Sequence, residues 1–125
     1  MSAESARTVA TRVVHRVRGG AYASATLDGE LRRAGLERRD AALAAQLSYG
    51  TLRVLDRLDQ AIAPHVRRGI ADVDPFVLAV LEVAAYQLFH LSRVPVYALV
   101  DEAVGYARAE RGPRVGGFVN AVLRK

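Results

Sequence analysis

Arginine is the residue type in this sequence with the clearest chemistry. Four arginines stand close together near the start of the chain: Arg7, Arg12, Arg16 and Arg18. Arg12 and Arg16 are one helical turn apart, so on a helix they share a face, which Arg7 and Arg18 flank. A guanidinium is planar and binds two phosphate oxygens at once. The segment therefore predicts a surface for a polyanion, with an ordinary solvated helix face as the alternative.

Two further features would add to such a surface. Arg53 and Arg57 are four residues apart and are predicted to share a helix face, although Asp56 and Asp59 lie close enough in sequence to neutralise them. Tyr22 follows the basic segment and could stack on a nucleobase. The alternative for Tyr22, which the sequence favours, is an aromatic contact between the first two helices.

The sequence lacks the residues that catalysis would need. It contains no cysteine, so thiolate nucleophiles, disulfides and zinc–thiolate sites are excluded. His15, His65 and His90 have no partners at catalytic or metal-binding spacing. Asp101 and Glu102 are adjacent and would point about 100° apart on a helix, so they cannot flank one substrate bond. Because the glycine pairs also match no phosphate-binding loop, we expect a non-catalytic chain without cofactor or metal.

The composition favours a single domain of packed helices. The chain has 125 residues, of which 51% are hydrophobic, and only four prolines. All but one of its 18 basic residues are arginine, and the net charge is +5, which suits nucleic acid but also occurs on ordinary solvated surfaces. Arginines interrupt the first segment, and no later apolar run is long enough to span a membrane. We therefore expect no signal peptide, no membrane helix and a cytoplasmic protein.

Apolar residues recur at helical spacing in seven segments. The predicted helices cover approximately residues 5–18, 24–34, 38–50, 52–62, 75–89, 96–107 and 116–125. Ser5, Ser24 and Asp74 are predicted N-caps, and residues 110–115 are predicted to form a loop. We therefore predict an all-α domain over residues 1–125, with about seven helices in two subbundles around the helix that contains Tyr49 and Gly50.

Three residues inside these helices differ from their surroundings. Gly50 offers a place where another helix can approach closely or where the axis can bend. Glu82 is the only charged residue of a helix that is apolar nearly all round and therefore belongs in the core. Asn120 is the one amide in the apolar last helix. A buried amide needs hydrogen-bond partners, so we expect Asn120 to have a structural role and to bond a neighbouring backbone.

Several motifs resemble the NusB family of all-helical RNA-binding domains. They are Ser-Tyr-Gly-Thr-Leu-Arg at 48–53, Tyr-Gln-Leu at 86–88, Val-Pro at 94–95, Val-Asp-Glu-Ala-Val at 100–104 and Phe-Val-Asn-Ala-Val-Leu-Arg at 118–124. The first and last are most similar to the N-terminal domain of small-subunit rRNA cytosine-5 methyltransferases. The resemblance implies rRNA binding through the basic first helix, an RNA contact from Arg93 and a catalytic domain beyond Lys125. The chain departs from the family at Glu82, where arginine is usual, and so lacks the ion pair or RNA contact that an arginine would supply.

Two other functions stay open at this point. One, which the resemblance also allows, is a free-standing transcription antitermination factor that binds leader RNA together with a small ribosomal protein. The other is a protein-interaction or dimerisation module, including a homodimer, in which apolar helix faces meet a partner. Continuation of the gene into a methyltransferase would separate the first alternative from the main interpretation.

Overall fold

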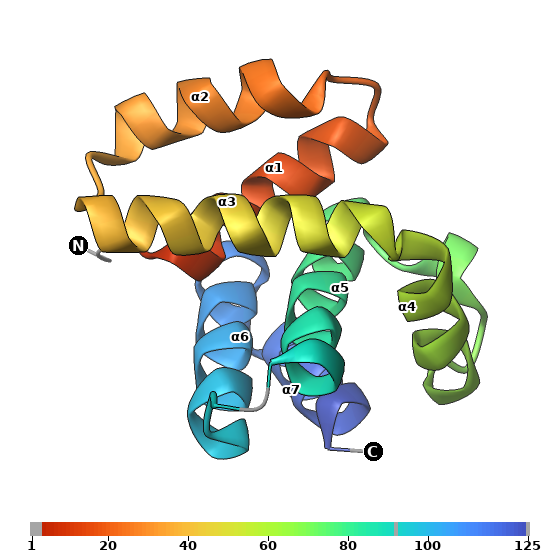
Figure 1. Cartoon of the computed structure of the whole chain (residues 1–125). Coiled ribbons are helices and arrows are strands. Elements are labelled where there is room, and N and C mark those ends of the chain that lie inside the picture. Colours follow the sequence, from red (N-terminus) through yellow and green to blue (C-terminus); the bar gives the residue numbers. More distant parts are fainter. Residues whose placement is uncertain (1–3, 92, 125) are drawn as a thin grey trace.

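The computed structural model describes residues 4–91 and 93–124 and is helical throughout its regular elements (Figure 1). Its seven α-helices are α1 (Ala6–Arg18), α2 (Ala23–Ala34), α3 (Arg38–Arg53), α4 (Leu55–Ile62), α5 (Pro75–His90), α6 (Val96–Arg111) and α7 (Pro113–Leu123). Two short 3-10 turns, Ala63–His65 and Ile70–Asp72, connect α4 to α5. The predicted all-α class and the number of helices are confirmed. Lys125, predicted to end the last helix, lies outside the described residues.

The helices form two subbundles that share α5 as their centre. Figure 1 shows α1, α2 and α3 packed together above α4, α5, α6 and α7. α5 packs against α1, α3, α4, α6 and α7, and its residues are buried without interruption from Phe76 to Gln87. The sequence-based prediction put the helix of Tyr49 and Gly50 at the centre. That prediction is wrong, because α3 keeps one face open, on which the Tyr49 side chain is 44% exposed.

Two of the three predicted N-caps are confirmed. The Ser5 hydroxyl accepts a hydrogen bond from the backbone of Thr8, whose side chain bonds back to the backbone N–H of Ser5, so α1 begins with a capping box. Asp74 accepts a hydrogen bond of 2.8 Å from the Phe76 backbone N–H, and Pro75 occupies the first helical position of α5. The third prediction is wrong. α2 begins one residue before Ser24, and its N-cap residue, Tyr22, makes no side-chain capping bond.

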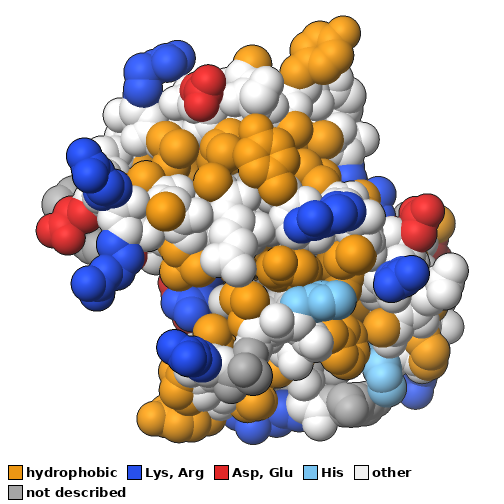
Figure 2. All heavy atoms as spheres, in the orientation of Figure 1, with side chains coloured by type: hydrophobic (Ala, Val, Ile, Leu, Met, Phe, Trp, Pro, Cys, Tyr) orange, Lys and Arg blue, Asp and Glu red, His pale blue; other side chains and the backbone are white. Residues whose placement is uncertain are grey.

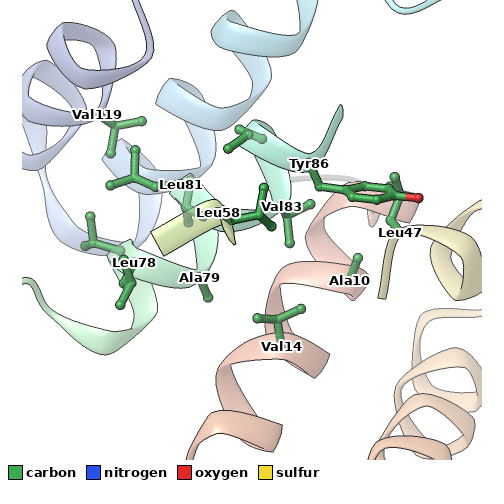
Figure 3. Close-up of a cluster of buried hydrophobic side chains, with 14 of the residues drawn as sticks. Ala10, Val14, Leu47, Leu58, Leu78, Ala79, Leu81, Val83, Tyr86 and Val119 are labelled. Atoms are coloured by element: carbon green, nitrogen blue, oxygen red, sulfur yellow. The ribbon is translucent and has the colours of Figure 1, made fainter. Parts of the chain in front are cut away.

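The Tyr86 side chain of α5 reaches the backbone of α3 at Gly50. A Cβ atom at position 50 would lie 2.2 Å from the ring of Tyr86, a separation that no unstrained structure allows. Figure 3 shows the Tyr86 ring reaching toward α3 beside Leu47, among buried side chains from several helices. The predicted close approach is therefore present, whereas the axis does not break at Gly50. α3 continues to Arg53, and the break falls at Val54, before α4.

The turn between α6 and α7 differs from the prediction of a loop at 110–115. α6 runs to Arg111, Gly112 makes the turn with a φ of 96°, and α7 starts directly at Pro113. Gly116 and Gly117 are therefore inside α7. Gly116 has a reason to be there, because a Cβ at this position would meet the Arg108 side chain of α6 at 3.1 Å.

Asn120 does not tie α7 to a neighbouring backbone, so that prediction is wrong. Its side chain is half-buried, and its Oδ1 accepts a hydrogen bond of 2.7 Å from Nε of Arg124, one turn later on the same helix. The residue lies at the edge of the packed face and not under it, where a local partner is enough to satisfy the amide.

Candidate nucleic-acid interface

Arg12 of α1 is held by a buried carboxylate of α2. Its Nε donates a hydrogen bond of 2.8 Å to Glu30, whose side chain is only 1% exposed. Although burial works against the charge, hydrogen bonds with Glu30, Tyr106 and Glu4 raise the pKa of the Arg12 guanidinium above its usual value. A carboxylate buried this deeply needs a cation beside it. Arg12 therefore joins α1 to α2 as an internal ion pair.

Arg18, at the end of α1, meets two carboxyl groups at once. Its guanidinium bonds both oxygens of Glu82 in α5 at 2.7–3.1 Å and Oδ2 of Asp59 in α4 at 2.6 Å. Glu82 is fully buried, and burial together with the nearby Asp59 raises its pKa to about 8 against the opposing effect of Arg18. The cluster contains one positive guanidinium and two carboxyl groups. When one of the carboxyl groups holds a proton, the other carries the single negative charge that balances Arg18, and the cluster is neutral. Glu82 thus has its partner inside the fold.

Arg7 joins α1 to the second subbundle. Its Nε donates to Oε1 of Gln87 in α5 at 2.6 Å, and its Nη1 lies 2.9 Å from Glu102 in α6. The hydroxyl of Ser5 donates to the other oxygen of Glu102 at 2.7 Å. Glu102 therefore links α6 to the start of α1. It has this structural role and does not form an acid–base pair with Asp101.

The arginines of α1 are therefore not a row of free cations. The side chains of Arg7, Arg12 and Arg18 are only 24–28% exposed, and each is held by an acidic partner from another helix. Arg16 differs from them, because its side chain is 53% exposed and its distance to Glu30 is 3.5 Å, at the limit of a hydrogen bond. Within the basic segment, Arg16 is the arginine best placed to meet a ligand.

A second group of arginines is exposed, with one at the end of α3, one in α4 and one just after α5. Arg53, Arg57 and Arg93 are exposed and have no ion-pair partner among the described residues. Neither Asp56 nor Asp59 forms an ion pair with Arg53 or Arg57, so the expected neutralisation of these two arginines does not occur. Asp59 binds Arg18 instead.

The exposed side chains of Tyr49 and His90 come from the same two helix ends as Arg53 and Arg93. Tyr49 is one helical turn before Arg53 on α3. His90, at the end of α5, stacks on Tyr86 with ring centroids 5.1 Å apart, and Tyr86 contacts α3 at Gly50. We use the name α3–α5 surface for the exposed set Tyr49, Arg53, Arg57, His90 and Arg93, which come from α3, α4, the end of α5 and the segment after it. In Figure 2, basic side chains are spread over the face formed by α3 and the end of α5, with few acidic ones between them and an apolar patch over α2 and α3.

Tyr22 is the most exposed of the large apolar side chains that the structure describes, at 84%. The aromatic contact between α1 and α2 that the sequence favours is therefore wrong, because the ring points away from both helices into solvent. An exposed ring beside a basic helix is available for stacking on a base.

The site contains no arrangement suited to metal chemistry in the described ranges, where no three His, Asp or Glu side chains converge. None of the helices described is long and apolar enough to cross a membrane.

Comparison with known proteins identifies the family. Residues 4–125 match the NusB family. The chain belongs to the NusB family. A protein of Mycobacterium tuberculosis that is named as a methyltransferase is 39% identical over 83% of this chain, and the ribosomal RNA small subunit methyltransferase B of Vibrio vulnificus is 33% identical over 94%. The transcription antitermination protein NusB of Laribacter hongkongensis is 34% identical over 96% of the chain.

The relatives differ in how much of them this NusB domain covers. The chain spans 22% of the Mycobacterium protein and 27% of the Vibrio methyltransferase, but 73% of the Laribacter NusB. Among solved structures, the crystal structure of antitermination factors NusB and NusE in complex with dsRNA contains a chain that superposes with a TM-score of 0.88 at 19% identity, covering 95% of this chain and 90% of that one. At this identity the likeness shows that the two chains share the fold.

Proposed function

We propose that this chain is a non-catalytic RNA-binding domain that recognises rRNA as the N-terminal part of an rRNA (cytosine-5) methyltransferase. The observation that carries the proposal is the α3–α5 surface, which combines exposed arginines that have no ion-pair partner among the described residues with the exposed rings of Tyr49 and His90. Guanidinium groups bind phosphates, and aromatic rings stack on the unpaired bases through which RNA is usually read. Membership of the NusB family and the names of the methyltransferase relatives support the choice of rRNA.

In this proposal the exposed residues make most of the contacts. Arg16, Arg53, Arg57 and Arg93 bind phosphates, and Tyr22 stacks on a base. Arg7, Arg12 and Arg18 also belong to the interface, through the quarter of each side chain that remains exposed. Their main role is to fix α1 against its neighbours, so they contribute to the positive field more than to direct bonds.

The catalytic step belongs to another part of the protein in this proposal. Cytosine-5 methylation needs a thiolate nucleophile and a pocket for a methyl donor, and the chain contains no cysteine. Residues 1–125 would form one domain that brings the substrate RNA to a catalytic domain in cis, in the cytoplasm. A free-standing antitermination factor, with a small ribosomal protein as partner, is the less favoured reading, since the methyltransferase relative of Mycobacterium is the more similar at 39% against 34% identity.

The proposal is tested by fluorescence anisotropy of the purified domain against a short labelled rRNA fragment and a DNA duplex of equal length. Both titrations are repeated at low and near-physiological salt. We expect tighter binding to RNA and a preference that persists at the higher salt, because stacking contacts are not screened as phosphate contacts are. Equal affinity for both nucleic acids, lost together as salt rises, would contradict recognition of RNA.

A further inference from the structure

A pocket separate from the α3–α5 surface lies between α1, α2, α6 and the start of α5. Here the molecule has an open hollow of about 470 Å³, which is within the size range of pockets that hold small molecules. Arginines from three helices line it, namely Arg12 and Arg16 from α1, Arg33 from α2 and Arg111 from α6. Two carboxylates, Glu30 and Glu110, also contribute, so the cations outnumber the anions two to one. We call this space the α1–α6 hollow.

The inner wall of the α1–α6 hollow is a connected row of aromatic rings. Phe76 lies edge-to-face against His15 with centroids 5.8 Å apart, and against Tyr106 with centroids 5.3 Å apart. The guanidinium of Arg111 lies 4.6 Å from the centre of the Phe76 ring. Phe76 itself is buried, whereas His15 and Tyr106 are half-buried and present ring surface to the hollow. A flat ligand would therefore find an aromatic surface with cations around it.

Two of the lining arginines are loosely held. Arg16 and Arg33 stand 3.5 and 3.8 Å from Glu30, with side chains 53% and 69% exposed. Glu30 does not depend on them, because Arg12 bonds it at 2.8 Å. Arg16 and Arg33 can thus turn toward an anion without leaving a buried carboxylate unpaired. By contrast, Arg111 is held by Asp74 at 3.0 Å.

We infer that the α1–α6 hollow binds one unstacked nucleotide of an RNA strand, with the phosphate between Arg16 and Arg33 and the base against His15 and Tyr106. The inference rests on the proposed function and names a place where a single base is taken out of the strand. Cations and rings are both required for this ligand. A phosphate alone would not need the aromatic wall, and an apolar ligand would not need the arginines.

The test uses nuclear magnetic resonance of the whole chain with guanosine and uridine 5′-monophosphates, and with inorganic phosphate as a separate titrant. Binding of the nucleotides should shift the ring signals of His15 and Tyr106 and the side-chain signals of Arg16 and Arg33. The double variant Arg16→Ala/Arg33→Ala should weaken nucleotide binding at least tenfold. It should remain folded, because Arg12 still pairs with Glu30. The variant Arg32→Ala/Arg39→Ala, which removes the same charge outside the hollow, should bind as the unchanged protein does.

Several results would overturn the inference. If inorganic phosphate binds as tightly as the nucleotides and leaves the rings unshifted, the hollow is an anion site without base recognition. If no titrant shifts these signals, and Arg16→Ala/Arg33→Ala binds the rRNA fragment as the unchanged protein does, the hollow has no part in RNA binding while the proposed function stands. The proposed function fails separately, when the unchanged protein does not distinguish RNA from duplex DNA.

Discussion

The arginines of α1 and those of the α3–α5 surface have the same chemistry but different surroundings. Arg12 and Arg18 each face a glutamate that is almost completely buried, whereas Arg53, Arg57 and Arg93 face solvent. A buried carboxylate holds its cation, because separating the pair would leave a charge in a medium of low dielectric. The role of an arginine in this fold therefore depends on the burial of its partner. The fold uses its α1 cations to join helices and leaves other cations available for a ligand.

The largest effect is expected from Arg18→Ala. Removal of this guanidinium leaves Glu82 and Asp59 facing each other without a cation. We expect a loss of about 2–4 kcal/mol in the free energy of unfolding, below the full cost of an unpaired buried charge because Glu82 can take up a proton instead. Urea unfolding followed by circular dichroism would measure it. Arg18→Lys should retain part of the stability. A loss no larger than that of an exposed arginine would show that Arg18 is not anchored.

Arg12→Ala should have the next largest effect. Glu30 would then depend on Arg16 and Arg33 at 3.5 and 3.8 Å, which are poor replacements for a bond of 2.8 Å. The expected loss is about 1–3 kcal/mol. Glu30→Gln removes the buried charge that needs Arg12, so Arg12→Ala should cost less in that background. A double-mutant cycle measures this coupling, and additive losses would contradict an ion pair between the two residues.

Stability should also depend on pH through Glu82. Its pKa in the fold is about 8, against about 4.5 in an unfolded chain, so between these values the folded protein holds a proton that the unfolded chain has lost. The stabilisation is fully present below pH 4.5 and is lost as the pH rises toward 8, with a slope of at most about 1.4 kcal/mol per pH unit for one proton. Unfolding measured at pH 5, 6.5 and 8 would show the decline. Glu82→Gln should make it shallower, and an equal slope in both proteins would contradict this origin.

The smallest effect on stability is expected at the α3–α5 surface. The variant Arg53→Ala/Arg57→Ala/Arg93→Ala removes three exposed side chains that have no ion-pair partner in the described ranges. Each replacement should change the free energy of unfolding by less than about 0.5 kcal/mol. A loss like that of Arg18→Ala would mean that these residues hold the fold and would remove the difference between the two regions.

Local signals in the sequence predict much of the fold and less of the interface. Ser5 and Asp74 cap their helices with bonds to residues two or three positions away, so the sequence alone shows them. Residues 110–115 are predicted to form a loop, but α7 begins at Pro113 directly after the Gly112 turn, and Gly116 packs on Arg108 of α6. The pairs Arg12–Glu30 and Arg18–Glu82 join residues 18 and 64 positions apart. Helical periodicity carries no information about such distant partners, so the sequence shows the arginines without showing which of them are already bound.

The most direct test of the account compares the salt dependence of RNA binding in two variants of equal charge. One is Arg53→Ala/Arg57→Ala/Arg93→Ala, and the other is Arg32→Ala/Arg38→Ala/Arg39→Ala, which removes three exposed arginines from the opposite end of α3 and the adjoining α2. Each phosphate contact contributes about 0.7 to the slope of log affinity against log salt concentration for a single strand. We predict a slope reduced by about 2 in the first variant and nearly unchanged in the second. Equal reductions in both would show that only net charge matters and would contradict an RNA-binding role for the α3–α5 surface.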